Sequence, residues 1–133
     1  MDLIYMITPG TSEIESNSIM PLSTIARRTG RIIKSNTNSV LLSAPGYYKV
    51  TASITFTAPA EGDVTVELQK GGIAVPGITA SATITTPTTE IENITLSGVV
   101  RVFPLDSVAV LTLFNSGVAI TSSNISFEVE YLG

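Results

Sequence analysis

Apolar and polar residues alternate along most of this chain with a period of two. The clearest stretch follows the Pro45-Gly46 pair and runs from Tyr47 to Thr57. One set of alternate positions carries Tyr48, Val50, Ala, Ile and Phe, and the other carries Tyr47, Lys, Thr and Ser. Successive side chains of a strand point to opposite faces of a sheet. The pattern therefore predicts a half-buried strand of a two-layer β protein.

Weaker forms of the same alternation recur on both sides of this stretch. Turn signals such as Gly71-Gly72 and Asn115-Ser116-Gly117 separate them. No segment shows a helical period, and many short strands between such turns indicate an antiparallel β-sandwich, a jelly roll of roughly 8–10 strands. The predicted strands cover residues 3–7, 31–35, 39–42, 47–57, 64–68, 73–75, 78–85, 90–103, 108–114 and 125–131.

The first 43 residues carry weaker signals. Pro9-Gly10 is expected to end the first strand, and residues 11–18 are polar and predicted to be a loop. Pro21 interrupts an apolar patch at residues 19–25, which predicts an edge strand or an extended segment. Residues 27–30 (RRTG) are predicted to be a turn.

Composition narrows the possible functions. A chain of 133 residues is expected to form one domain. It contains 0 Cys and 0 His, which excludes Ser-His-Asp and Cys-His catalysis and sites built from thiolates. Only 14% of its residues are charged, against about 25% in typical globular domains. A surface so poor in charge suits burial against other copies or a larger particle. The alternative is a small rigid β domain with a Thr-rich outer face.

Charge is unevenly distributed along the chain, whose net charge is −4. Residues 44–133 are strongly acidic, which argues against nucleic-acid binding as the main task because phosphate contacts need cations. The N-terminal residues lack the basic region of a signal peptide, and no apolar run approaches the roughly 20 residues of a membrane span.

Four motifs follow one another in residues 39–133. Pro45-Gly46-Tyr47-Tyr48 opens the long strand, and residues 66–72 (VELQKGG) combine a strand with a hairpin turn. Residues 105–110 (LDSVAV) join a turn to a strand, and residues 125–129 (ISFEV) begin the last strand. In this order the motifs resemble the tumour necrosis factor-like superfamily, especially the globular heads of complement 1q-like proteins. Leu105 stands where that family more often has Gly. With no Cys and few aromatic residues, the chain is more similar to bacterial and phage versions of the fold.

The resemblance implies a jelly roll that forms a tight homotrimer. An independent argument points the same way, because residues 108–114 (VAVLTLF) are apolar on both faces and a lone sandwich covers only one. The alternative is a central strand covered by loops. The candidate residues of the trimer interface or core are Tyr47, Tyr48, Val108, Val110, Leu111, Leu113 and Phe127.

Acidic residues give two weaker candidates. Three acids fall in predicted loops and could bind calcium: Asp106, Glu61 and Asp63. The favoured interpretation is that they form turns at the starts of strands. The pairs Glu90/Glu92 and Glu128/Glu130 could in principle support hydrolysis, but they alternate with apolar residues and are expected to be solvated. No catalytic residue, metal or cofactor is therefore predicted.

The chain has a single basic cluster, which consists of Arg27, Arg28, Arg31 and Lys34. It is a candidate docking site for an acidic partner, or a solvated loop that offsets the acidic body. Residues 1–43 precede the motif-bearing part, residues 44–133. They are a candidate docking segment, or the first strands of a single jelly-roll domain that covers residues 1–133.

These expectations combine into a functional prediction. The chain is expected to be a non-enzymatic structural protein of a particle surface, most plausibly a bacteriophage virion, where it acts as a homotrimeric capsid decoration protein or head-fibre knob. Its partners would be its own copies and capsid or other virion proteins, with no membrane. It would be made in the host cytoplasm without a signal peptide. The alternatives are a receptor- or glycan-binding fibre tip and a spore-surface head domain.

Overall fold

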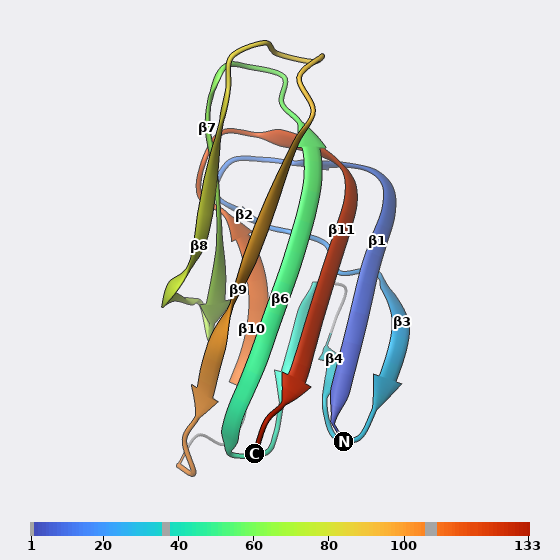
Figure 1. The fold of residues 1–133 in the computed structure, drawn as a ribbon, viewed down its shortest axis with the longest axis vertical. Helices are drawn as coiled ribbons and strands as arrows, with labels where there is room; N and C mark the ends of the chain where they lie inside the picture. Colours follow the sequence, from blue (N-terminus) through green and yellow to red (C-terminus); the bar gives the residue numbers. More distant parts are fainter. Residues whose placement is uncertain (1, 36–37, 106–108) are drawn as a thin grey trace.

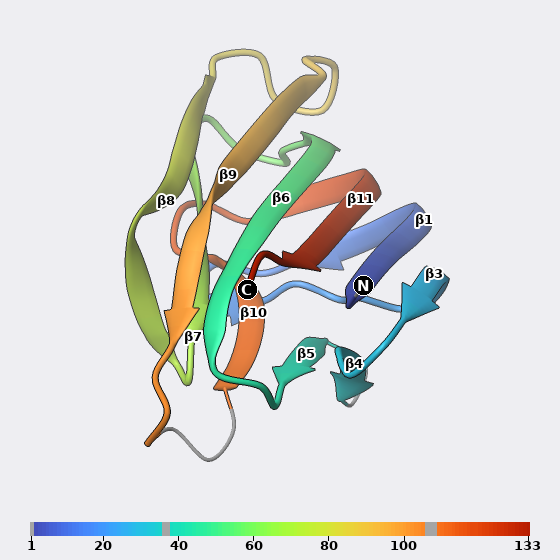
Figure 2. The same cartoon turned by 60° about the horizontal axis from the view of Figure 1, so that its bottom comes forward.

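The computed structural model describes residues 2–35, 38–105 and 109–133 and shows two packed antiparallel sheets (Figures 1 and 2). Sheet A has the strand order β3-β1-β11-β6-β9, and sheet B has the order β4-β5-β10-β7-β8, with β2 also paired to β10. The described residues contain no helix, and so none that could cross a membrane. The strands are β1 (Leu3–Ile14), β2 (Ser18–Ile19), β3 (Thr24–Thr29), β4 (Ile33–Ser35), β5 (Ser39–Leu42), β6 (Gly46–Thr57), β7 (Gly62–Lys70), β8 (Ile73–Ile84), β9 (Glu92–Val102), β10 (Ala109–Asn115) and β11 (Ile120–Tyr131).

The predicted all-β jelly-roll sandwich is confirmed. The described residues form 11 strands, slightly more than expected, in part because the short β2 pairs with the end of β10. Period-two alternation located β6, β7, β9 and β11, since each buries every second residue against the opposite sheet.

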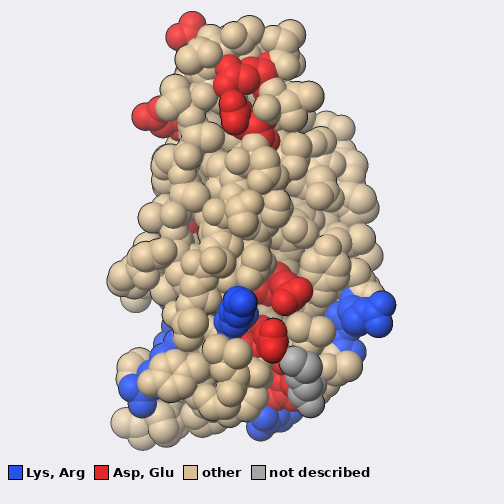
Figure 3. All heavy atoms as spheres, in the orientation of Figure 1, with Lys and Arg blue, Asp and Glu red and all other residues tan. Residues whose placement is uncertain are grey.

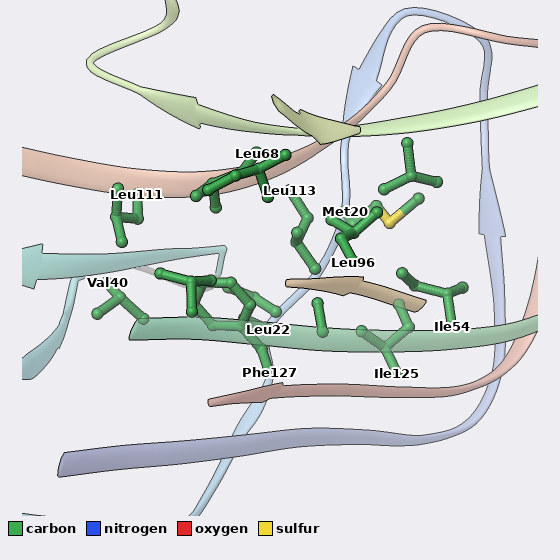
Figure 4. Close-up of a cluster of buried hydrophobic side chains, with 14 of the residues drawn as sticks. Met20, Leu22, Val40, Ile54, Leu68, Leu96, Leu111, Leu113, Ile125 and Phe127 are labelled. Carbon is green, nitrogen blue, oxygen red and sulfur yellow. The ribbon is translucent and has the colours of Figure 1, made fainter. Parts of the chain in front are cut away.

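The core lies between the two sheets and is made of their inward side chains (Figure 4). Phe127 of β11 is fully buried and stands opposite Ala52 of β6, so a large and a small side chain share one row. Full burial of each such aromatic or aliphatic side chain stabilises the fold by about 1.5–3 kcal/mol. The largest buried side chains include Tyr48, Phe56, Phe127, Met20, Leu22, Ile54 and Leu68.

Two strands, β1 and β8, continue through Pro-Gly pairs that were predicted to interrupt them. The prediction was wrong at both positions. β1 continues through Pro9-Gly10 to Ile14, with an irregularity in its pairing to β11 between Pro9 and Ser12 and a left-handed Gly10 (φ 82°). β8 likewise continues through Pro76-Gly77, where Gly77 has φ 83°. A β-bulge lets a strand absorb a residue that breaks the ladder and still resume pairing.

The predicted turn at residues 27–30 is also wrong, because Arg27, Arg28 and Thr29 belong to β3. β3 pairs with β1 along the edge of sheet A, and all six of its residues are exposed. An edge strand with both faces in solvent has no apolar period, so alternation could not reveal it. The chain turns after it, at Gly30 (φ 77°).

The first and last strands lie side by side in sheet A. β11 pairs with β1 on one side and with β6 on the other, so it is the central strand of the sheet. Backbone hydrogen bonds tie the chain ends together, from Tyr131 N to Asp2 O (2.9 Å) and from Tyr47 N to Gly133 O (3.1 Å). Both described ends therefore lie at one end of the sandwich (Figure 1).

Candidate functional site

The predicted interface residues do not share one surface. Four of them are fully buried in the core of the single chain, namely Tyr48, Leu111, Leu113 and Phe127. Tyr47 lies on the outer face of sheet A with 46% of its surface exposed. Val110 is half-buried on the outer face of sheet B, and Val108 lies outside the described residues.

β10 occupies the centre of sheet B, between β5 and β7. Its outward residues Val110 and Phe114 are half-buried, and they stand beside Leu41 and Ile19 on the neighbouring strands. The outward apolar side chains of β10 are thus partly covered by neighbouring strands of the same chain. They do not by themselves require a partner.

Sheet A carries a broad outer surface without charge, which we call the neutral face. Figure 3 views this side and shows a wide band without Lys, Arg, Asp or Glu between two charged ends. The residues of the neutral face come from three adjacent strands and are in register with one another: Thr51, Ser53 and Thr55 of β6, Asn93, Thr95 and Ser97 of β9, and Asn124 and Ser126 of β11.

Polar groups of the neutral face bind one another across the strands. Asn93 Nδ2 donates to Ser53 Oγ (3.0 Å) and Thr55 Oγ1 (2.9 Å), and Thr95 Oγ1 donates to Asn93 Oδ1 (3.0 Å). Ser123 Oγ adds a hydrogen bond to the Thr55 carbonyl (3.3 Å). Because these groups already have partners within the chain, covering them would leave few hydrogen bonds unmade.

Acidic residues gather at one end of the sandwich, where β1 ends and β7 and β9 begin. Glu90 lies in the connection before β9, and its Oε1 accepts hydrogen bonds from Thr85 N, Thr86 N and Thr85 Oγ1, each 3.0 Å long. The two backbone N–H groups, the Glu92 side chain and the hydroxyl lower the pKa of Glu90 to about 2. The hydrogen bond to Glu90 raises the pKa of Glu92. Glu90 thus fixes the connection between β8 and β9 through its hydrogen bonds to Thr85 and Thr86.

The acidic residues proposed as calcium ligands do not form a cluster in the part of the chain that the structure describes. Asp106 lies outside them, and Asp63 accepts a hydrogen bond from Thr83 Oγ1 (2.8 Å). In residues 2–35, 38–105 and 109–133, no three or more His, Cys, Asp or Glu side chains lie close enough to hold a metal ion. Glu128 and Glu130 lie on the outer face of β11 opposite Thr51 and Lys49.

The basic cluster divides between two strands and the turn that joins them. Arg28 donates to the carbonyls of Ile32 and Gly30 (both 2.8 Å), and Lys34 donates to the Ser23 carbonyl (2.8 Å). These contacts fasten the corner from β3 to β4. Arg27 is exposed on β3 beside Tyr5 of β1.

Arg31 of the cluster pairs with Asp2 at 2.8 Å and lies over the Tyr131 ring, 5.4 Å from its centre. The hydrogen bond that Arg31 donates to the Asp2 carboxylate raises the pKa of the Arg31 guanidinium. Arg31 therefore joins the β3–β4 corner to the paired chain ends. Docking of a partner on the cluster stays a prediction.

A groove that the sequence did not reveal lies beside the hairpin between β7 and β8. Its volume is about 540 Å³, and aliphatic residues of the hairpin form one wall while the end of β9 forms the other. Arg101 of β9 lies over two aromatic rings, 4.5 Å from the centre of Phe103 and 5.5 Å from that of Tyr47. In the sequence, Val99, Arg101 and Phe103 alternate on the outward side of β9, but the opposite wall comes from a separate hairpin.

Comparisons with known proteins identify the fold. No protein-family model matches the chain, and no curated protein matches its sequence. Among solved structures, the globular domain of the zebrafish complement 1qA protein matches with a TM-score of 0.71 and 9% identity, covering 100% of this chain and 98% of that one. Murine APRIL matches with a TM-score of 0.67 and 12% identity, covering 97% of this chain and 98% of that one. The chain therefore has the tumour necrosis factor/complement 1q-like jelly-roll fold that its motifs indicated.

Proposed function

We propose that this chain is a non-enzymatic domain that associates as a homotrimer through the neutral face of sheet A. The observation that carries the proposal is the breadth of that face together with its lack of charge (Figure 3). Burying a charged group costs several kcal/mol unless it is paired, whereas hydroxyl and amide groups that already have partners cost far less. A face of this kind is well suited to contact with an identical face or edge.

Apolar side chains beside the neutral face would add to such a contact. Tyr47 and Val99 are 46% and 54% exposed and lie on the same side of sheet A. On β1, Ile7 is half-buried and stands opposite Ser126 of the neutral face. Their burial contributes roughly 25 cal/mol for each Å² of apolar surface removed from water. The family resemblance supports the same assembly, since it implies a homotrimer.

The neutral face can be tested with one pair of matched variants. Light scattering of the purified chain is expected to give a mass about three times 14.0 kDa that persists on dilution. Ser97→Glu places a carboxylate on the neutral face, and we expect it to release monomers because the contact would have to bury an unpaired charge. Ser81→Glu makes the same change on an exposed strand residue of sheet B and should leave the trimer intact.

Two results would contradict this assignment. A monomeric parent chain would remove the homotrimer altogether. Dissociation by Ser81→Glu but not by Ser97→Glu would move the contact to sheet B.

The more specific proposal is that the trimer is a structural component of a particle surface, in particular a bacteriophage virion, as a capsid decoration protein or head-fibre knob. The support is the low charge content of the whole chain, 14%, which suits a surface largely covered by neighbours. Gold-labelled antibodies against the chain should decorate intact particles released from cells that produce it. Label confined to the soluble fraction would count against a particle role and leave the trimer untouched.

A further inference from the structure

The groove beside the β7–β8 hairpin combines an apolar wall with a positioned cation, and Val99 is the one described lining residue that the proposed trimer contact also uses. Ile73 is 75% exposed and Val99 is 54% exposed, and they line this groove with Val75, Phe103, Lys70 and Arg101. Its volume of about 540 Å³ falls within the range of about 300–1,000 Å³ that is typical of small-molecule sites.

Arg101 is held in place by stacking. Its guanidinium carbon lies 4.5 Å from the centre of the Phe103 ring and 5.5 Å from the centre of the Tyr47 ring. These are the two aromatic side chains of the described residues with the greatest exposure. A guanidinium fixed on aromatic faces loses little conformational freedom when it binds an anion, and its planar set of donors matches a carboxylate.

A second cation lies on the other side of Phe103. Lys70 Nζ is 5.5 Å from the centre of that ring and donates a hydrogen bond to the Arg101 carbonyl (3.0 Å). Within the part of the chain that the structure describes, Arg101 forms no ion pair, since the ion pair found there joins Arg31 and Asp2. The described lining of the groove thus contains two cationic side chains, Lys70 and Arg101, and no acidic one.

We propose that this groove binds small amphipathic carboxylates, in which an aryl or alkyl body packs against the hairpin wall and the carboxylate pairs with Arg101. Charge complementarity at Arg101 and the aliphatic lining together select this class. A neutral saccharide fits poorly, because the described lining contains no Asn, Gln, Asp, Glu, Ser or Thr side chain to bind its hydroxyls. The proposal does not depend on the trimer.

Two-dimensional NMR of the full ¹⁵N-labelled chain tests the site with three probes. Sodium 3-phenylpropanoate carries both parts of the expected ligand, 3-phenylpropanol keeps the body without the charge, and sodium acetate keeps the charge without the body. We expect the first to shift the amide signals of residues 71–75 and 99–103, and the other two to bind at least about tenfold more weakly, which corresponds to about 1.4 kcal/mol.

Matched variants assign the contacts. Arg101→Gln should weaken 3-phenylpropanoate by about tenfold, while Arg27→Gln removes an exposed arginine of β3 and should leave its affinity unchanged. Ile73→Ser changes a side chain that is 75% exposed, so the fold should persist while the affinity falls by about threefold or more.

The proposal would be overturned by shifts scattered over the surface, by equal affinity for the acid and the alcohol, or by equal affinity for the acid and acetate. An Arg101→Gln variant that binds as tightly as the parent would also overturn it. The dispersion of the amide signals reports in the same spectra that each variant is folded.

Discussion

At the scale of single residues, Gly117 shows how little space the turn after β10 has. A Cβ atom at this position would lie 2.4 Å from Asp63 O and 2.5 Å from Thr65 N. The turn is held against β7 by hydrogen bonds from Ser116 N to Thr65 O (2.9 Å) and from Val118 N to Asp63 O (3.1 Å). Glycine is required here by the neighbouring backbone and not by an unusual φ.

We expect Gly117→Ala to lower the free energy of unfolding by about 3 kcal/mol or more, since overpacking costs about 1–3 kcal/mol even where side chains can yield. Gly98→Ala is the matched control. Its Cβ would lie 2.5 Å from Ile78 Cγ1 and 2.7 Å from Ile78 Cδ1, and a side chain can shift at a lower cost than the backbone that Gly117 faces. Urea unfolding should therefore rank Gly117→Ala below Gly98→Ala. Equal losses would contradict the backbone argument.

The Glu90 carboxylate should titrate far below an ordinary glutamate. Its pKa of about 2 lies below the unfolded value, so its stabilisation of the loop is present above pH 4.5 and is lost as the pH falls through about 2. Carboxyl ¹³C shifts recorded against pH can follow both members of the pair. In Glu90→Gln we expect the pKa of Glu92 to fall, because Glu90 is what raises it. An unchanged Glu92 pKa would argue against the pairing.

At the scale of elements, the strength of the alternation decided what the sequence could predict. Strands with one face in the core, such as β6 and β11, carry a full period and were predicted within a few residues. β3 has no buried face, and β1 and β8 cross Pro-Gly pairs that usually end a strand. The groove could not be predicted from the sequence for a different reason. Its walls come from β9 and from the β7–β8 hairpin, and only the folded chain brings these segments together.

The β7–β8 hairpin offers a test of turn geometry. Gly71 and Gly72 have φ values of 61° and 83°, and no atom lies within 4 Å of a Cβ at either position. Asn tolerates a left-handed backbone, whereas a β-branched residue pays about 1–2 kcal/mol there. We expect Gly71→Asn to leave the urea midpoint unchanged or slightly higher and Gly71→Val to lower it. A Val variant as stable as the Asn variant would contradict the assigned turn.

At the scale of the whole molecule, charge is separated along the long axis of the sandwich. Figure 3 shows basic atoms, with acidic atoms among them, toward the end that holds the chain termini, and acidic atoms alone at the opposite end. The 7 basic residues of the chain, all at the first end, are Arg27, Arg28, Arg31, Lys34, Lys49, Lys70 and Arg101. The acidic end carries Glu13, Glu15, Glu61, Asp63, Glu90 and Glu92.

This separation predicts unusual behaviour on ion exchangers. At pH 7 and low ionic strength we expect the chain to bind a sulfonate resin as well as a quaternary-amine resin, although its net charge is −4. Retention on both should vanish near 0.15 M salt, where the screening length is about 8 Å. The double variant Glu13→Gln/Glu61→Gln should weaken binding to the amine resin alone. Passage straight through the sulfonate resin would show that the basic end does not act as a patch.

The place of β11 in sheet A has a consequence for how the molecule is made. This strand joins β1 to β6, and it is the last of the described strands to leave the ribosome. Until it emerges, β1 and β6 each present an open ladder edge, and such edges are prone to pair with other chains. Synthesis that stops before residue 120 would leave sheet A in two unjoined parts. Sheet A can therefore be completed only after residues 120–131 have emerged, and until then the open edges of β1 and β6 remain available for pairing with other chains.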